Sequence, residues 1–296
     1  MVFGGLLARR RDTASEASSS RQRLIEDINK DLPAGLDWKA GALRYVNDFL
    51  ENTADKAAAT KFMTTKPFNT IGDNQQASIA GLIWYVGNFL NTVQLLNLPR
   101  GSHILDVACG AGWLSDLLSR IGYVPYGVDL SREFIELARE RIEALEGRPM
   151  DERFLTMDIE IEPLPSTVHG KFSAAIFESC LHHFHDPLTA IEHIGQELTK
   201  DGLLVILEGE NRRGPIKDEY VNVMTETHTL ERPYSREQLL RILDMTGFPE
   251  REVVASINGF FGSKQWDTMN DYARTMAEGR NYVIAARSKE ALARIL

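Results

Sequence analysis

The stretch His103-Ile-Leu-Asp-Val-Ala-Cys-Gly-Ala-Gly-Trp113 contains an apolar run, an acid and a Gly-x-Gly turn in close succession. Its apolar residues are of the β-branched or large kind that fills a strand buried on both faces. Gly110 and Gly112 allow a tight turn and a close approach of the backbone to a ligand. A helix is expected to follow over 114–121, with its free N–H groups directed at that ligand. The stretch therefore predicts a cofactor site.

A dinucleotide-binding turn of the G-x-G-x-x-G type is the competing interpretation, and Ser115 is small enough for it. It leaves Asp106 unexplained, because a carboxylate four residues before the first glycine would repel a pyrophosphate. The same carboxylate suits a ligand with an ammonium and a sulfonium. At this point the chain resembles the class I S-adenosylmethionine-dependent methyltransferases, whose first motif has the form acid-x-x-x-Gly-x-Gly. A nicotinamide-dependent oxidoreductase would not need Asp106.

Acids also follow the next two predicted strands. Val124 to Val128 end at Asp129, where one carboxylate can accept both ribose hydroxyl protons of a cofactor. A third strand ends at Asp158, and the resemblance implies that Asp158 hydrogen-bonds the adenine amino group while Met157 or Ile159 packs on the ring. Helix capping in loops is the alternative for these acids. We favour the cofactor role because open α/β sheets bind ligands at the carboxyl ends of their strands.

Taken together, the resemblance implies S-adenosylmethionine as cofactor. The cofactor-binding residues that it implies are Asp106, Ala108, Gly110, Gly112, Trp113, Asp129, Leu130, Asp158, Ile159 and Phe177. Trp113 is expected in the wall of the site rather than in the chemistry.

A fourth strand, Phe172 to Phe177, leads into Glu178-Ser179-Cys180-Leu181-His182-His183. Methyl transfer to a hydroxyl requires alignment, exclusion of water and removal of a proton. An imidazole, with an unperturbed pKa of about 6.5, accepts a proton at neutral pH. The catalytic candidates are His182, His183, Glu178 and His228. Since adjacent side chains point differently, at most one of the paired histidines is expected to reach the acceptor; both could instead only line the pocket.

Metal binding is the rival interpretation of His182, His183, His185 and Asp186. Neighbouring ligands on one short loop do not readily close a tetrahedral site, and the sequence shows no second cluster to complete it. We therefore predict no metal. Cys109 and Cys180 are interpreted as small apolar fillers, and two cysteines in 296 residues indicate a reducing compartment.

Further strands are expected over 203–208, after an Asp201-Gly202 turn, and over 252–257 and 281–286. With these, the resemblance implies an α/β fold: a Rossmann-like, seven-stranded, mostly parallel sheet flanked by helices, with one antiparallel strand. An aromatic-rich insert, Phe260 to Trp266, separates the last two strands.

Local signals place several helix starts. Ser131 and the Asp186-Pro187 pair are expected N-caps, and Ser235 with Gln238 forms a capping box. The segment 212–233 lacks clear periodicity.

The chain before the sheet divides into a tail over 1–22, predicted to be disordered, and a helical accessory or lid region over 23–98; the methyltransferase domain follows over 99–296. Apolar residues recur at helical spacing within the accessory region: Leu43, Tyr45, Val46 and Phe49, then Ile79, Leu82, Ile83, Val86 and Phe89. Lys61 to Asn69 is polar and interrupted by Pro67. Family members often fold such a segment over the cofactor, so it is either a lid or an ordinary connector.

Composition agrees with a small-molecule enzyme. The chain has 296 residues, 43% hydrophobic, and a formal net charge of −9. That charge argues against a nucleic-acid partner held by broad electrostatics. No apolar run approaches membrane-spanning length, and the protein is expected to be cytoplasmic.

The acceptor is less determined than the cofactor. Asn-Pro-Pro-Tyr, typical of enzymes that methylate DNA or release factors, is absent at 178–181, which favours O-methylation. Lys66-Pro67-Phe68, the Cys109 to Ser115 form of the first motif and Glu231 to Ser235 are similar to enzymes of glycan and glycolipid assembly. The resemblance thus favours a sugar hydroxyl or sugar-linked group in a small-molecule or glycan substrate. A lipid, quinone or polyketide-like acceptor is the alternative, and so is a non-catalytic S-adenosylmethionine-binding protein.

Overall fold

A central sheet organises the described part of the chain. The structure is a computed structural model, and it describes residues 18–51, 63, 66–68, 75–168, 170–210, 212, 214–254 and 280–294. Residues 1–17, most of the predicted lid over 61–69 and the insert Phe260 to Trp266 lie outside the described residues. The described strands are β1 (His103–Val107), β2 (Val124–Asp129), β3 (Phe154–Thr156), β4 (Phe172–Glu178), β5 (Leu198–Glu210), β6 (Glu250–Val253) and β7 (Arg280–Ala286).

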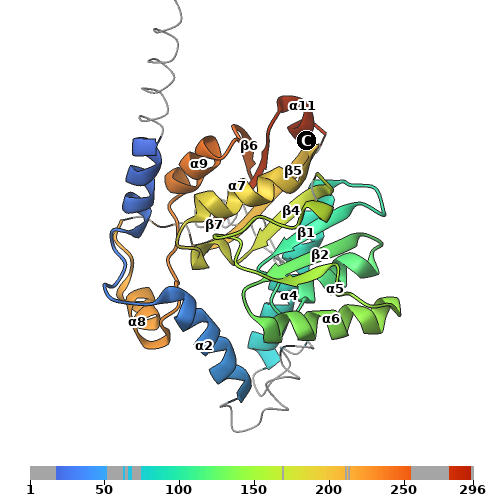
Figure 1. Ribbon diagram of the computed structural model, residues 1–296, viewed down its shortest axis with the longest axis horizontal. Coiled ribbons are helices and arrows are strands. Elements are labelled where there is room, and N and C mark those ends of the chain that lie inside the picture. Colours follow the sequence, from blue (N-terminus) through green and yellow to red (C-terminus); the bar gives the residue numbers. More distant parts are fainter. Residues whose placement is uncertain are drawn as a thin grey trace, which may run out of the picture.

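These strands form one seven-stranded sheet in the order β3-β2-β1-β4-β5-β7-β6 (Figure 1). β1 pairs in parallel with β2 on one side and with β4 on the other. β7 runs antiparallel to both β5 and β6. The predicted α/β sheet with one antiparallel strand is therefore confirmed for the described residues. The strand order reverses between β1 and β4, and ligands bind in the crevice at such a point.

Helices cover both faces of this sheet (Figure 1). Residues 18–29 are helical. The other described helices are α2 (Trp38–Glu51), α4 (Gln75–Leu96), α5 (Trp113–Arg120), α6 (Arg132–Glu146), α7 (Pro187–Glu197), α8 (Asp218–Thr227), α9 (Arg236–Met245) and α11 (Lys289–Leu292), with short 3₁₀ turns at η1 (Ser166–Val168) and η2 (Leu181–His183).

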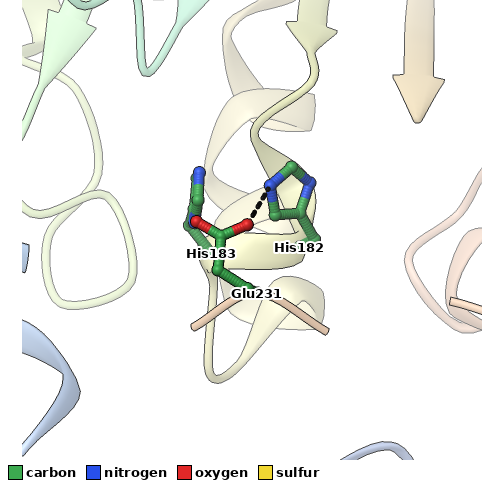
Figure 2. Close-up of side chains that lie close together, drawn as sticks. All are labelled: His182, His183 and Glu231. Atoms are coloured by element: carbon green, nitrogen blue, oxygen red, sulfur yellow. Dashed lines mark ion pairs between the residues drawn. The ribbon is translucent and has the colours of Figure 1, made fainter. Parts of the chain in front are cut away.

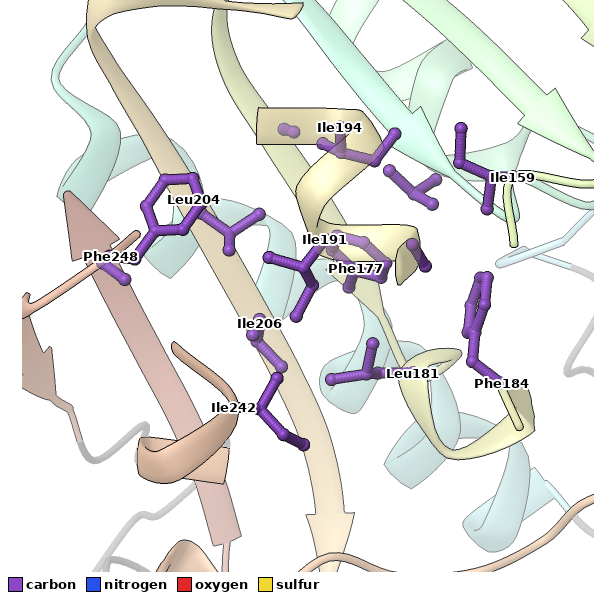
Figure 3. Packing of buried hydrophobic residues seen from close by; sticks show 14 of the residues in the cluster. Ile159, Phe177, Leu181, Phe184, Ile191, Ile194, Leu204, Ile206, Ile242 and Phe248 are labelled. Carbon is purple, nitrogen blue, oxygen red and sulfur yellow. The ribbon is translucent and has the colours of Figure 1, made fainter. Parts of the chain in front are cut away.

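Alternate side chains of each central strand enter different cores. Leu204 and Ile206 of β5 pack with Ile191 of α7 and Ile242 of α9 (Figure 3). The neighbouring side chain of Val205 points to the opposite face, into a core formed with α4, α5 and α11. Burial on both faces explains why these strands are continuous apolar runs rather than alternating ones.

The predicted helix starts are confirmed. The Ser131 hydroxyl accepts a hydrogen bond from the Phe134 N–H at 3.1 Å, and the Asp186 carboxylate accepts one from the Thr189 N–H, also at 3.1 Å. Ser235 and Gln238 form both hydrogen bonds of a capping box. Each cap satisfies an N–H group that the helix itself leaves unpaired.

Several predicted boundaries are wrong. Helix begins by residue 18, within the tail predicted to be disordered over 1–22. β5 already begins at Leu198, because Leu198 pairs with Phe172; a register shift before the Ala174–Leu203 pair absorbs the expected Asp201-Gly202 turn into the strand. β6 begins at Glu250 rather than at 252 and ends earlier than expected.

The segment 212–233 contains a helix, α8, that its sequence did not predict. Two acids, Asp218 and Glu219, lie in its first turn, where they interact favourably with the helix dipole. Met224 is its one buried residue and packs with Ile216 and Leu230. A single buried position is too little to produce a visible periodicity.

The accessory region is less buried than its spacing predicted. Phe89 of α4 is buried as expected, but Ile83 of the same helix is 37% exposed and Leu43 of α2 is 38% exposed. α2 contacts α6 and α8. Among the described residues, no helix combines the length and apolarity that a membrane-spanning segment needs.

Replacing Ile191 by alanine should lower the free energy of unfolding by about 2 to 5 kcal/mol, because Ile191 is completely buried between α7 and β5. Ile161→Ala is the matched control, since Ile161 is 70% exposed, and its effect should stay within about 0.5 kcal/mol. Urea unfolding of both variants measures the difference. Equal effects would show that α7 does not pack as described.

Candidate active site

A cavity of about 970 Å³ lies at the carboxyl ends of β1 to β4. The loops after the strands form one side of it, and Leu36 to Lys39, Ala42, Met63, Lys66, Trp84 and Tyr85 of the accessory region form another. A volume of this size is at the upper end of ordinary ligand pockets. It therefore has room for a cofactor and a second molecule.

Most of the predicted site residues line this cavity. They are Ala108, Gly110, Trp113, Asp129, Leu130, Asp158, Ile159, Glu178 and His183. Asp106, Gly112, Phe177, His182 and His228 are not among the lining residues. Phe177 packs in the core against Phe184, with ring centroids 5.9 Å apart, so its position gives no support to the predicted contact with a cofactor.

The backbone after β1 turns as the glycine pattern predicted. Ala108, Gly110 and Gly112 all have positive φ angles, of 52°, 51° and 74°. A Cβ at Gly112 would lie 3.0 Å from the Cβ of Ala138, so a glycine here lets α5 and α6 approach closely. A Cβ at Gly110 would have only Phe134 nearby, at 4.0 Å. Gly110 thus keeps the floor of the cavity open.

Asp129 joins this turn to the next helix. Its carboxylate accepts hydrogen bonds from the Gly110 N–H at 2.9 Å and from the Ser131 N–H at 2.8 Å. Burial raises the pKa of Asp129, and these backbone donors oppose the increase. Asp129 lines the cavity, so its remaining acceptor positions are available to a ligand.

Asp106 lies behind the turn rather than in the cavity wall. It is almost completely buried, and its carboxylate accepts a 2.8 Å hydrogen bond from the Ser115 hydroxyl of α5. Burial raises the pKa of Asp106 from 3.8 to about 7, although the Ser115 hydrogen bond opposes the shift and the nearby Glu178 adds to it. A positive ligand in the cavity would favour the charged form of this carboxylate.

Glu178, at the end of β4, faces the same cavity. Burial raises its pKa from 4.5 to about 7, while the positive charge of Lys66 and a 3.2 Å hydrogen bond from the Ser179 hydroxyl oppose the shift. Lys66 comes from the segment predicted as a lid. Its ammonium lies 4.5 Å from the ring centroid of Tyr85 and 5.4 Å from that of Trp113. This part of the wall therefore already holds one cation on aromatic rings.

Asp158 is held from two sides. The Glu160 N–H donates to its carboxylate at 3.1 Å, and Lys39 of α2 forms an ion pair with it. Met157 and Ile159, the two residues predicted to pack on an adenine ring, both line the cavity beside it. Lys39 thereby joins α2 to the loop after β3.

The two histidines of η2 have different surroundings. His182 Nδ1 lies 2.7 Å from Glu208 Oε2, and its Nε2 lies 3.5 Å from Glu231 Oε2. Burial lowers the pKa of His182, but the charges and hydrogen bonds of Glu208 and Glu231 outweigh it and raise the pKa from 6.5 to about 10. An imidazole that is already protonated at neutral pH cannot accept a proton, which argues against His182 as base.

His183 lines the cavity, and its side chain is 42% exposed there. Its Nδ1–H donates to the Leu230 carbonyl at 2.5 Å, which leaves the lone pair on Nε2. Partial burial and the positive charge of His182 lower the pKa of His183 below its usual 6.5. His183 is therefore neutral at pH 7 but a weak base.

Glu231 brings its carboxylate beside both imidazole rings (Figure 2). The two ring centroids are 4.0 Å apart, and Glu231 Oε1 lies 3.7 Å from His183 Nδ1. Glu231 belongs to the segment after α8. This segment therefore adds a polar group from a second part of the chain to the two histidines, which the sequence alone did not predict. His228 forms the left-handed C-cap of α8 with φ 57° and lies outside the cavity wall, so its catalytic assignment loses its geometric basis.

Sequence analysis also missed Glu208. Glu208 is 6% exposed at the end of the apolar run of β5, and it accepts hydrogen bonds from both the Leu181 N–H at 2.8 Å and His182. The pattern that identified Asp129, an acid directly after an apolar run, also identifies Glu208. Phe134 and the aromatic residues Trp84 and Tyr85 of the wall carried no motif.

Comparison with known proteins gives the family. A sequence model described as a methyltransferase domain matches residues 88–252, which include the glycine turn and most of the cavity wall. The chain belongs to this methyltransferase family.

Relatives and solved structures agree with this assignment. A ubiquinone biosynthesis O-methyltransferase of Actinobacillus pleuropneumoniae is 33% identical over 104 residues, 35% of this chain and 44% of the relative. The mitochondrial one of Bos taurus is 30% identical over 183 residues, 58% of this chain and 49% of the relative. The chain thus spans less than half the length of either relative.

Two solved methyltransferases share the fold at 17% identity. Geranyl diphosphate C-methyltransferase from Streptomyces coelicolor has a TM-score of 0.56, and magnesium protoporphyrin IX methyltransferase from Synechocystis has one of 0.53. In each case 86% of this chain is covered and 100% of the other. At this identity the likeness establishes the class I methyltransferase fold and nothing finer.

The residues present fit S-adenosylmethionine, the cofactor of this family. Asp129 and Glu178 place carboxylates on the cavity, and Asp106 lies just behind them. These negatively charged hydrogen-bond acceptors suit a ligand that carries an ammonium, a sulfonium and a ribose. The open turn at Gly110 provides the close backbone approach. A pyrophosphate would meet the same carboxylates unfavourably, so the dinucleotide alternative is not supported.

The free energy of unfolding of the unliganded protein should fall as the pH rises from 5 to 8, and in Asp106→Asn it should fall less. A carboxyl whose pKa is raised from 3.8 to about 7 binds its proton more tightly when folded, so the stability that it contributes at low pH is lost as the pH passes through that window. Between pH 5 and the raised pKa of about 7 lie two pH units, which correspond to at most about 3 kcal/mol. Urea unfolding at both pH values measures the effect.

The exposed carboxylate of Asp151 provides the control, since Asp151→Asn should leave the pH dependence unchanged. An equally steep pH dependence in Asp106→Asn and the parent protein would contradict the burial of an uncompensated carboxyl at Asp106.

Proposed function

We propose that this chain transfers a methyl group from S-adenosylmethionine to a hydroxyl oxygen of a quinol or related phenol. The observation that carries the proposal is one cavity whose wall combines carboxylates and the glycine turn with apolar and aromatic side chains. The accessory region supplies Leu36, Trp38, Met63, Trp84 and Tyr85 to that wall. An apolar and aromatic wall suits a flat, aromatic acceptor better than a sugar.

The names of the relatives support the quinone alternative over the predicted sugar hydroxyl. Both relatives described above are named ubiquinone biosynthesis O-methyltransferases. Because the chain matches less than half of each, the acceptor stays a proposal for this protein. The glycan acceptor that the sequence predicted has no support from these names.

For the cofactor, we assign the ribose hydroxyls to Asp129 and the adenine to the pocket of Met157, Asp158 and Ile159. Asp129 keeps acceptor capacity beyond its two backbone hydrogen bonds. Asp158 lies at the same rim, where Lys39 joins it to α2. The ammonium end is assigned to the side of Asp106, whose negative charge favours a cation.

When bound, S-adenosylmethionine supplies a methyl group activated by a sulfonium. The residues of the chain have to align the acceptor oxygen with that carbon and to receive the hydroxyl proton. The new O–CH₃ bond forms as the S–CH₃ bond breaks, and the electron pair of the broken bond stays on sulfur. The released proton passes to a basic side chain.

Glu178 is the side chain that we assign to this proton. It ends β4 at the cavity, beside the region assigned to the cationic part of the cofactor. A general base works best with a pKa near the working pH, and that of Glu178 is about 7. His183 faces the same cavity but its pKa is depressed, and we assign it to the acceptor wall.

Asp129→Ala should weaken the binding of S-adenosylhomocysteine by at least about 10- to 100-fold, the loss expected for one charge-assisted hydrogen bond of about 1.5 to 3 kcal/mol, and by more where both ribose hydroxyls lose their acceptor. Calorimetric titration at fixed salt measures the affinity. Asp151→Ala, at an exposed carboxylate, is the control and should bind as the parent does. Unchanged affinity in Asp129→Ala would remove Asp129 from the cofactor site.

Glu178→Gln should lower kcat by about 10²- to 10⁴-fold, the usual contribution of a general base. The assay supplies labelled S-adenosylmethionine with reduced quinones, and in parallel with nucleotide-sugar and glycan extracts. Glu152→Gln, at an exposed glutamate, is the control. Label in the glycan extract alone would overturn the acceptor class, and full activity of Glu178→Gln would overturn the base.

A further inference from the structure

We propose that His182, His183 and Glu231 form a binding site for a divalent first-row transition-metal ion at the part of the cavity wall that we assign to the acceptor. One ligand atom from each of the three side chains lies within 4.8 Å of the others. The site combines two segments, η2 and the residues after α8, which removes the reason for which the sequence predicted no metal. The role that we assign to the ion rests on the proposed function, whereas the site itself does not.

The spacing fits metal ligands better than a direct ion pair. His182 Nε2 and Glu231 Oε2 are 3.5 Å apart. A charged N–H···O hydrogen bond is about 2.7 to 2.9 Å long. Two ligands at about 2.0 to 2.1 Å from a tetrahedral ion lie roughly 3.4 Å from each other. The separation of the two side chains thus matches the edge of a coordination tetrahedron.

Both imidazoles are oriented as metal ligands usually are. A ligating histidine donates its other N–H to a carboxylate or a backbone carbonyl. His182 Nδ1 pairs with the buried carboxylate of Glu208 at 2.7 Å, and His183 Nδ1 donates to the Leu230 carbonyl at 2.5 Å. With Nδ1–H engaged in this way, the lone pair of each neutral ring lies on Nε2, and the two outer partners fix the ring orientations independently of Glu231.

The charge of the cluster also favours a cation. Glu208 and Glu231 bring two carboxylates to His182. Within the part of the chain that the structure describes, neither carboxylate forms an ion pair with a lysine or arginine. A divalent ion bound between Nε2 of His182 and Glu231 would balance this negative charge. Its distance to Glu231 would be shorter than the 3.5 Å that separates Glu231 from His182 Nε2.

Two imidazoles and one carboxylate select the kind of ion. Imidazole ligands suit Zn²⁺, Fe²⁺, Co²⁺ or Ni²⁺ rather than Ca²⁺ or Mg²⁺. Three protein ligands leave a coordination position open. His183 and Glu231 both line the cavity, so that position is available to the hydroxyl of an acceptor. There the ion would hold and polarise the hydroxyl whose proton Glu178 receives.

The test is metal uptake by the full chain without a polyhistidine tag. The protein is stripped with a chelator, dialysed and titrated with Co²⁺, and visible absorption and bound metal are measured. We expect one equivalent with a Kd of about 1 μM or lower. Glu231→Gln and His182→Gln should weaken binding at least tenfold, and Glu208→Gln by about 10- to 100-fold through its orienting hydrogen bond.

His103→Gln, at the opposite end of β1, is the matched control and should bind like the parent. Far-ultraviolet circular dichroism checks the fold of each variant; Glu231 is partly exposed on a loop, so its variant is expected to fold. Absence of stoichiometric uptake by the parent, or unchanged uptake in a folded Glu231→Gln, overturns the site.

Titration of the same samples with S-adenosylhomocysteine separates this proposal from the proposed function. Cofactor binding without metal uptake rejects the metal site alone. Metal uptake without cofactor binding or methyl transfer leaves the site in place and rejects the function proposed above.

Discussion

The carboxylate of Asp129 holds together the part of the fold on which the cavity depends. It accepts the N–H of Gly110 after β1 and the N–H of Ser131 at the start of α6. One side chain therefore fixes the glycine turn, the end of β2 and the entry of a helix. Asp106 does the same on the other side of β1 by binding Ser115 of α5. The cavity floor lies between these two connections, at the reversal of strand order.

The same arrangement concentrates negative charge where water is scarce. Burial raises the pKa values of Asp106 and Glu178 to about 7; the charge of Glu178 adds to the increase at Asp106, and that of Glu208 adds to the increase at Glu178. A protein optimised only for stability would avoid these buried carboxyls. A cationic ligand offsets their cost, and in its absence Lys66 brings a positive charge towards Glu178. The destabilising feature and the cofactor specificity therefore have one origin.

The sequence predicted those features that local pattern determines. Strand ends, caps and the positive-φ glycine turn depend on neighbouring residues, and Asp129 was found because a parallel strand must end at the ligand edge. Contacts between distant segments left no such pattern: Glu208 meets His182 across 26 positions, and Glu231 reaches the histidines from a loop after a helix with one buried residue. His228 was a catalytic candidate like His183, yet it caps the end of α8 and is not among the residues that line the cavity.

The unlike behaviour of His182 and His183 follows from the geometry of η2. Successive side chains of a 3₁₀ turn point about 120° apart, because the turn has three residues. Only one of the pair can therefore face the cavity, and it is His183, whereas His182 is directed at Glu208 below the end of β5. Glu231 lies beside one ring nitrogen of each histidine, so a change at either histidine is transmitted to the other through one carboxylate. The pair acts as a unit although its members face different environments.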